Sequence, residues 1–119
     1  VVATLSGTTF SFGTAVVVDT VYTAWFYATF DSTNDKIVIA YADNGNSDYG
    51  TAIVGTVSGT SISFGSAIDT PPTNDNTIEN LVIFDSGNNK MVVSYRDESN
   101  NSGTSFVLPI DVYQGIKTK

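Results

Sequence analysis

Hydrophobic residues along this chain fall in short runs that are separated by clusters of polar turn residues. Two clear examples are "KIVIAY" at 36–41 and "KMVVSY" at 90–95, both rich in β-branched residues and bounded by Asp, Asn, Ser and Gly. Runs of this length and composition are typical of β-strands. No stretch sustains the 3.6-residue period of an amphipathic helix. The pattern therefore predicts an all-β protein built from short antiparallel strands.

Two longer phrases show that the pattern occurs twice. The phrase "SGTTFSFGTA" at 6–15 returns as "SGTSISFGSA" at 58–67, 52 positions later. The phrase "FDSTNDKIVIAYAD" at 30–43 returns as "FDSGNNKMVVSYRD" at 84–97, 54 positions later. Phrases that recur in the same order at nearly the same spacing indicate an internal repeat.

A third, weaker pair sets the period of the repeat. It consists of "GTAIV" at 50–54 and "GTSFV" at 103–107, 53 positions apart, so the period is about 53 residues. A chain of 119 residues is of the size of one domain. We expect a single all-β domain over 1–119 with repeat 1 at about 6–58, repeat 2 at about 58–112 and a C-terminal tail at 113–119.

Each repeat is expected to form four antiparallel strands. In repeat 1 these strands are predicted at about 9–18, 23–30, 36–42 and 50–58. Several of the polar turns begin at an aspartate that recurs in the other repeat, and Asp side chains commonly bond the backbone of their own turn. We therefore expect a structural, turn-capping role for Asp31, Asp43, Asp85 and Asp97.

Four antiparallel strands in about 53 residues resemble the blade of a β-propeller in period and strand count. The repeated "SGT-SFG" and "D-K-V-Y-D" patterns also look like those of large exported bacterial proteins and phage structural proteins. This resemblance implies an extracellular or virion-surface protein. Because a propeller takes about four blades or more, three arrangements follow. The two repeats pack face to face as a blade pair or small sandwich, several chains form a ring, or the chain belongs to a longer array.

The N-terminus adds one strand to the two sets of four. Residues 3–5 align with residues 55–57, which end the fourth strand of repeat 1. The extra strand comprises Val1, Val2, Ala3, Thr4, Leu5 and Ser6. It either clasps the last strand of its own chain, expected at 104–112, or completes the sheet of a neighbouring copy by β-augmentation. A third interpretation is that it reflects where the chain was cut.

Composition argues against several classes of function. The net charge is −7, with 5 basic and 12 acidic residues. Such a surface repels phosphate backbones and anionic lipid, so we expect no nucleic-acid partner. No apolar run approaches the roughly 18 residues of a membrane span, so we expect no membrane insertion. The sequence has no His and no Cys, which are frequent catalytic bases and nucleophiles, so we do not expect an enzyme.

One turn offers a candidate cation site. The stretch "DNGNSDYG" at 43–50 carries four hard oxygen donors: Asp43, Asn44, Asn46 and Asp48. Its equivalent in repeat 2, "DESNN" at 97–101, offers Asp97, Glu98 and Asn100. Calcium prefers carboxylate and amide oxygens, but neither turn supplies the bidentate Glu of a full calcium loop. The sequence thus predicts no cofactor and leaves calcium at these turns as an open alternative.

Aromatic side chains suggest a second kind of ligand. Exposed rings beside amides and carboxylates are typical of sugar sites, and the candidate glycan contacts are Tyr22, Trp25, Tyr27 and Tyr49. Repeat 2 has Glu79 in place of Trp25, whereas a lectin built from repeated sites would repeat its aromatic residue. The sequence therefore favours Trp25 and Tyr27 as filling a gap between sheets or subunits, with glycan binding as the alternative. The sequence also has one N-glycosylation sequon, at Asn100.

These observations favour a non-enzymatic structural subunit of an extracellular or virion-surface fibre or appendage. Its expected partners are copies of itself, joined by β-strand complementation through residues 1–6. One alternative is a carbohydrate-binding, lectin-like module that oligomerises into a propeller ring. The other is a fragment of a large adhesin.

Overall fold

The computed structural model describes residues 1–70 and 76–108. Its strands are all antiparallel, which confirms the all-β class. The elements are β1 (Ala3–Ser6), β2 (Thr9–Phe12), β3 (Thr23–Asp31), β4 (Lys36–Asp43), the 3-10 turn η1 (Asn44–Asn46), β5 (Tyr49–Ser58), β6 (Ser61–Phe64), β7 (Ile68–Asp69), β8 (Thr77–Asp85), β9 (Lys90–Asp97) and β10 (Ser102–Leu108). The expected end of the last strand at 109–112 and the tail at 113–119 lie outside the described residues.

The sequence repeat is also a repeat of the backbone. Strands β3-β4-β5 and β8-β9-β10 form the same three-stranded meander. Both meanders have a register shift at the same place, between Ala24 and Tyr27 in β3 and between Ile78 and Leu81 in β8. The bulged residue in β3 has a φ of 56°, and the bulged residue in β8 has a φ of 57°. Extra residues of this kind bend a strand and increase its twist.

The recurring aspartates cap their own turns, as predicted. One carboxylate oxygen of Asp31 accepts from the backbone N–H groups two and three residues later, at 2.9 and 3.0 Å. Asp85 does the same at 3.0 and 3.2 Å. Asp43 and Asp97 each accept from the N–H two residues later, at 2.8 Å. These bonds satisfy backbone donors that the turn would otherwise leave unpaired.

The sheets do not divide where the sequence repeats divide. The larger sheet has the order β3-β4-β5-β6, and β7 also pairs with β5, although β6 and β7 belong to repeat 2. The first strand of repeat 2 therefore completes the sheet of repeat 1. The corresponding strand of repeat 1, predicted at 9–18, is wrong beyond Phe12, because residues 13–22 form no strand. Their repeat equivalents in β7 have β5 as a partner, and an extended segment without a partner forms no ladder.

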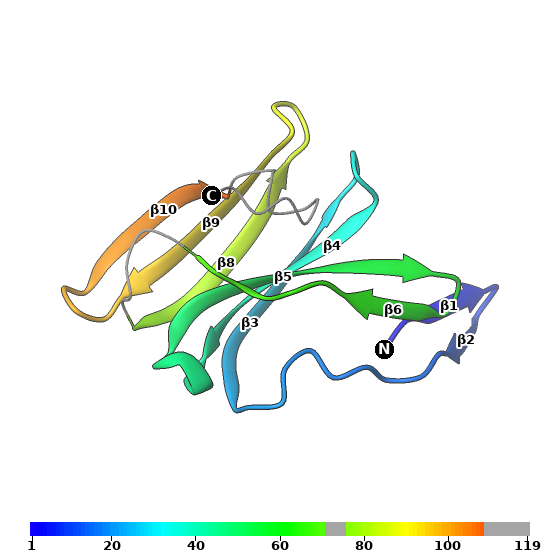
Figure 1. The fold of residues 1–119 in the computed structure, drawn as a ribbon. Coiled ribbons are helices and arrows are strands. Elements are labelled where there is room, and N and C mark those ends of the chain that lie inside the picture. Colours follow the sequence, from blue (N-terminus) through cyan, green and yellow to red (C-terminus); the bar gives the residue numbers. More distant parts are fainter. Residues whose placement is uncertain (71–75, 109–119) are drawn as a thin grey trace.

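The two sheets share one hydrophobic core. Repeat 1 contributes Val38, Ala40 and Ala52 to it, and repeat 2 contributes Val82, Met91, Val93 and Leu108. The sheets approach each other most closely at β3 and β8, which are the equivalent first strands of the two meanders. Figure 1 shows the second meander lying beside the first, with β8 as its nearest strand. The fold of each repeat is thus completed by the other.

The N-terminal strand folds into a hairpin of its own. Strand β1 pairs with β2 in a separate two-stranded sheet, and within the described part of the chain it does not pair with β10, as the clasp alternative would have required. The hairpin lies near the β5–β6 end of the molecule (Figure 1). At its exit Gly13 is so close to Thr60 that a Cβ would collide with the carbonyl oxygen, which explains the glycine. The use of residues 1–6 as a strand donor stays a prediction.

Candidate functional site

A groove of about 250 Å³ lies where the two repeats meet, at the η1 end of the sheets. Its lining combines aromatic, amide and carboxylate side chains with a few apolar ones: Tyr22, Ala24, Trp25, Ala42, Asn44, Asp48, Asn76, Thr77, Ile78 and Glu98. Residues up to Asp48 come from repeat 1, and the rest come from repeat 2. The groove therefore exists only because the repeats pack together.

Backbone hydrogen bonds fix the two walls of the groove in the same way. The N–H of Asn44 donates to the carbonyl of Tyr22 at 3.1 Å. One repeat later, the N–H of Glu98 donates to the carbonyl of Asn76, also at 3.1 Å. A third bond, from the N–H of Thr77 to the carbonyl of Asp48 at 3.0 Å, joins the two walls. The groove is built on strand ends and turns that these backbone hydrogen bonds connect, and a site formed before the ligand arrives is favourable for binding.

Trp25 is the largest side chain of the groove and the most unusual in its backbone. It occupies the bulge of β3 with a φ of 56°, in the left-handed region that bulky residues rarely adopt. Its side chain remains 49% exposed, and that of Tyr22 is 72% exposed. The two rings present apolar faces to solvent beside the polar groups of the groove. Strained backbone of this kind is found disproportionately at binding sites.

The predicted cation turn forms one rim of this groove. Its polar side chains are engaged mainly with each other and with the neighbouring strand. The amide of Asn44 donates to Asp48 at 3.1 Å, and that of Asn46 donates to Asp69 at 2.9 Å. Within residues 1–70 and 76–108, no group of three or more His, Cys, Asp or Glu side chains is placed to hold a metal ion. Calcium at this turn stays an untested prediction.

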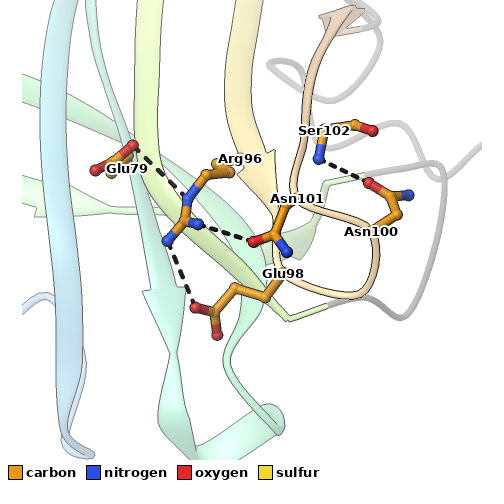
Figure 2. Close-up of polar contacts among 6 residues, drawn as sticks. All are labelled: Glu79, Arg96, Glu98, Asn100, Asn101 and Ser102. Carbon is orange, nitrogen blue, oxygen red and sulfur yellow. Dashed lines mark hydrogen bonds and ion pairs between the residues drawn. The ribbon is translucent and has the colours of Figure 1, made fainter.

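On the repeat 2 side, a charged cluster positions Glu98 at the rim. Arg96 lies between two carboxylates, 3.7 Å from Glu98 and 4.0 Å from Glu79 (Figure 2). It also donates to the amide oxygen of Asn101 at 3.0 Å. Exposed ion pairs of this kind contribute little to stability, so their main effect is to orient Glu98. Since Asp48 is also at the rim, the groove is acidic and suits neutral or cationic ligands.

The sequon residue Asn100 lies in the exposed turn after β9. Its side-chain nitrogen donates to Asp97 at 2.8 Å, and its side-chain oxygen accepts from the N–H of Ser102 at 2.8 Å. Figure 2 shows the second of these bonds. A glycan attached to this nitrogen would modify the atom whose hydrogen bond to Asp97 stabilises the turn. Glycosylation at Asn100 stays a prediction.

The structure brings together only part of what the sequence singled out. Of the four candidate glycan contacts, Tyr22 and Trp25 line the groove, whereas Tyr27 and Tyr49 do not. Sequence reasoning did not associate Asn76 with the site. The repeat alignment was the available signal, because Asn76 and Glu98 stand one repeat after Tyr22 and Asn44.

Comparison with known protein families, with curated proteins and with solved structures gives no significant match to this chain. In the part of the chain that the structure describes, no helix is long and apolar enough to cross a membrane.

Proposed function

We propose that this chain is a structural subunit of an extracellular or virion-surface fibre or appendage, and that it assembles with copies of itself. The observation that carries the proposal is the way the two repeats are joined. Strands β6 and β7 of repeat 2 complete the sheet of repeat 1 by pairing with β5. Within this chain, one repeat therefore adds strands to the sheet of the other. Separate subunits combine in the same way in β-augmentation.

Strands at both ends of the molecule have edges to which another chain could add a strand. Among the described residues β10 is paired only with β9, which leaves one long edge of the second sheet open. At the other end, no third strand within residues 1–70 and 76–108 pairs with the β1–β2 hairpin. Open edges are sites at which another chain can add a strand. The absence of His and Cys from the sequence agrees with a non-enzymatic role.

Assembly can be tested directly on the full chain. We expect negative-stain electron microscopy to show filaments or higher oligomers, and sedimentation velocity to show a mass that grows with concentration. A chain lacking residues 1–6 tests whether the N-terminal strand takes part in assembly. Thr8→Asp, in the exposed turn that follows β1, is the matched control that leaves the strand in place. A full chain that stays monomeric at every concentration overturns the proposal.

A second candidate function is recognition of a neutral carbohydrate by the groove. It is favoured by one observation, that Tyr22 and Trp25 are exposed beside Asn44, Asp48 and Glu98. Aromatic faces pack on sugar rings, amides donate hydrogen bonds to sugar hydroxyl groups and accept them, and carboxylates accept them. We expect Trp25→Ala to abolish binding on a glycan array. Tyr27→Ala, which removes a similarly exposed ring outside the groove, is the control.

A further inference from the structure

We infer that the two ends of this molecule are complementary, and that copies of the chain associate head to tail through a second version of the contact that joins its own repeats. The inference rests on the proposed self-assembly and goes beyond it by naming the surfaces and the partner. It assigns the main contact to two sheet faces that are half exposed in the single chain.

The contact between the two repeats of one chain is the pattern for the proposed contact between two chains. One side of it is a face of repeat 1 that is formed by β4 and β5, with Val38, Ala40, Ala52 and Val54. The opposing face of repeat 2 is formed by β8, β9 and β10, with Val82, Phe84, Met91, Val93, Phe106 and Leu108. Side chains alternate between the two faces of a strand, so each sheet also has an outer face that this contact leaves uncovered.

The outer face of repeat 2 is the repeat equivalent of the covered face of repeat 1. We call it the second outer face, and its apolar members are Leu81, Ile83, Val92 and Val107. Val92 and Val107 stand one repeat after Val38 and Val54. Ile83 and Val107 are each 53% exposed. Of the repeat 1 equivalents, Val38 is 0% exposed and Val54 packs against the core, whereas Tyr27, the equivalent of Leu81, is 52% exposed. On repeat 2 nothing described covers Val92 and Val107 in the way that repeat 2 covers Val38 and Val54.

The outer face of repeat 1 is likewise the equivalent of the covered face of repeat 2. We call it the first outer face, and its apolar members are Ala28, Phe30, Ile37, Ile39 and Ile53. Ile53 is already buried in the single chain, at 4% exposed, so the open part of this face is formed by the other four. They stand one repeat before Val82, Phe84, Met91, Val93 and Phe106. Phe30 is 51% exposed, while its equivalent Phe84 packs against the core. The molecule thus carries equivalents of both halves of its own repeat contact, one on the outer face of each sheet.

The centre of the second outer face is adapted to burial although it is more polar. Ser94 and Ser105 stand where repeat 1 has Ala40 and Ala52. The two hydroxyls are 2.8 Å apart and hydrogen-bond each other. A polar group that already has a partner costs little to bury. The charged cluster of Arg96 lies at the end of the same face, as a polar rim (Figure 2).

A second copy placed in this way would also bring a pairing partner to the outer edge of β10. In the internal contact, Ile68 and Asp69 of β7 pair with Ala52 and Thr51 of β5. The equivalents of these two pairs are Val16 with Ser105, and Val17 with Thr104. Val16 and Val17 are exposed and lie outside any strand, and the outer edge of β10 is unpaired among the described residues. One placement of a second copy therefore provides a partner for both the open faces and the open edge.

The test uses two full-length variants, each of which blocks one face. Phe30→Glu puts a charge on the first outer face, and Ile83→Glu puts one on the second. Both side chains are about half exposed, so folding should survive and is checked by circular dichroism. Ser86→Glu, in the exposed turn between β8 and β9, is the control for charge alone. Mass is measured by sedimentation velocity for each variant alone and for an equimolar mixture.

We expect the wild type and the Ser86→Glu control to assemble, and each face variant alone to remain a monomer. The mixture should form a dimer and nothing larger, because each variant supplies the face that the other has lost. Wild-type assembly that neither face variant weakens would overturn this inference and leave the proposed function standing. Dimers of one variant alone would indicate a symmetric contact and also overturn it. A monomeric wild type would overturn both.

Discussion

Val38 and Val92 are the same residue at equivalent positions of β4 and β9, yet the structure predicts different effects when each is shortened to alanine. Val38 is 0% exposed in the core between the sheets, whereas Val92 is half-buried on the outer face. Removing two buried methyl groups costs roughly 0.8 kcal/mol for each. A residual cavity of about 30 Å³ adds about 0.7 kcal/mol. We therefore expect Val38→Ala to lower the free energy of unfolding by about 2.3 kcal/mol, and Val92→Ala by about 1 kcal/mol or less.

The measurement is urea unfolding followed by far-ultraviolet circular dichroism, at a protein concentration where sedimentation shows a monomer. The slope of the free energy against urea should be unchanged in both variants, so that the midpoints report stability alone. At higher concentration the loss caused by Val92→Ala should grow, because association stabilises the folded state and that variant weakens the contact. Equal losses for the two variants in the monomer would refute the placement of the core on one face of each sheet.

Three further predictions concern the turns and the strand bulges. Asp31→Ala is expected to lower the free energy of unfolding by about 2 kcal/mol in chemical denaturation, because three hydrogen bonds to a buried carboxylate are lost. The side-chain hydrogen bond from Ser99 lowers the pKa of Asp97, so its contribution is present above the unfolded pKa of about 3.8 and is lost as the pH falls through the folded value. Melting temperatures between pH 6 and pH 2 should therefore fall more steeply for the wild type than for Asp97→Asn, and parallel curves would contradict this account. Glu79→Gly should raise stability by up to about 1 kcal/mol, since Glu79 has a φ of 57°; Glu98→Gly, at an exposed residue without positive φ, should not.

The repeat alignment carried more information about this protein than any single motif. It predicted the turn-capping aspartates, and the hydrogen bonds of Asp31 and Asp85 match one another atom for atom. It did not reveal that one repeat supplies a strand to the sheet of the other. Trp25 shows the same difference, between what the sequence predicted and what only the packing revealed, for the groove. Its aromatic character was visible in the sequence, but its position beside Asn76 depends on how the repeats pack.

The sequence by itself determined the local structure. Strands predicted at 23–30, 36–42 and 50–58 correspond to β3, β4 and β5 to within one residue at each end. Strand length and turn position are set by residues close together in the chain, so the hydrophobic pattern is enough to find them. Only the tertiary structure decided which edge each strand joins. Residues 13–17 and 65–69 are similar in sequence, yet only the second segment pairs as β7, because only it has the edge of β5 beside it. Strand pairing is decided by contacts between residues that are distant in the sequence, and a single repeat does not contain both partners.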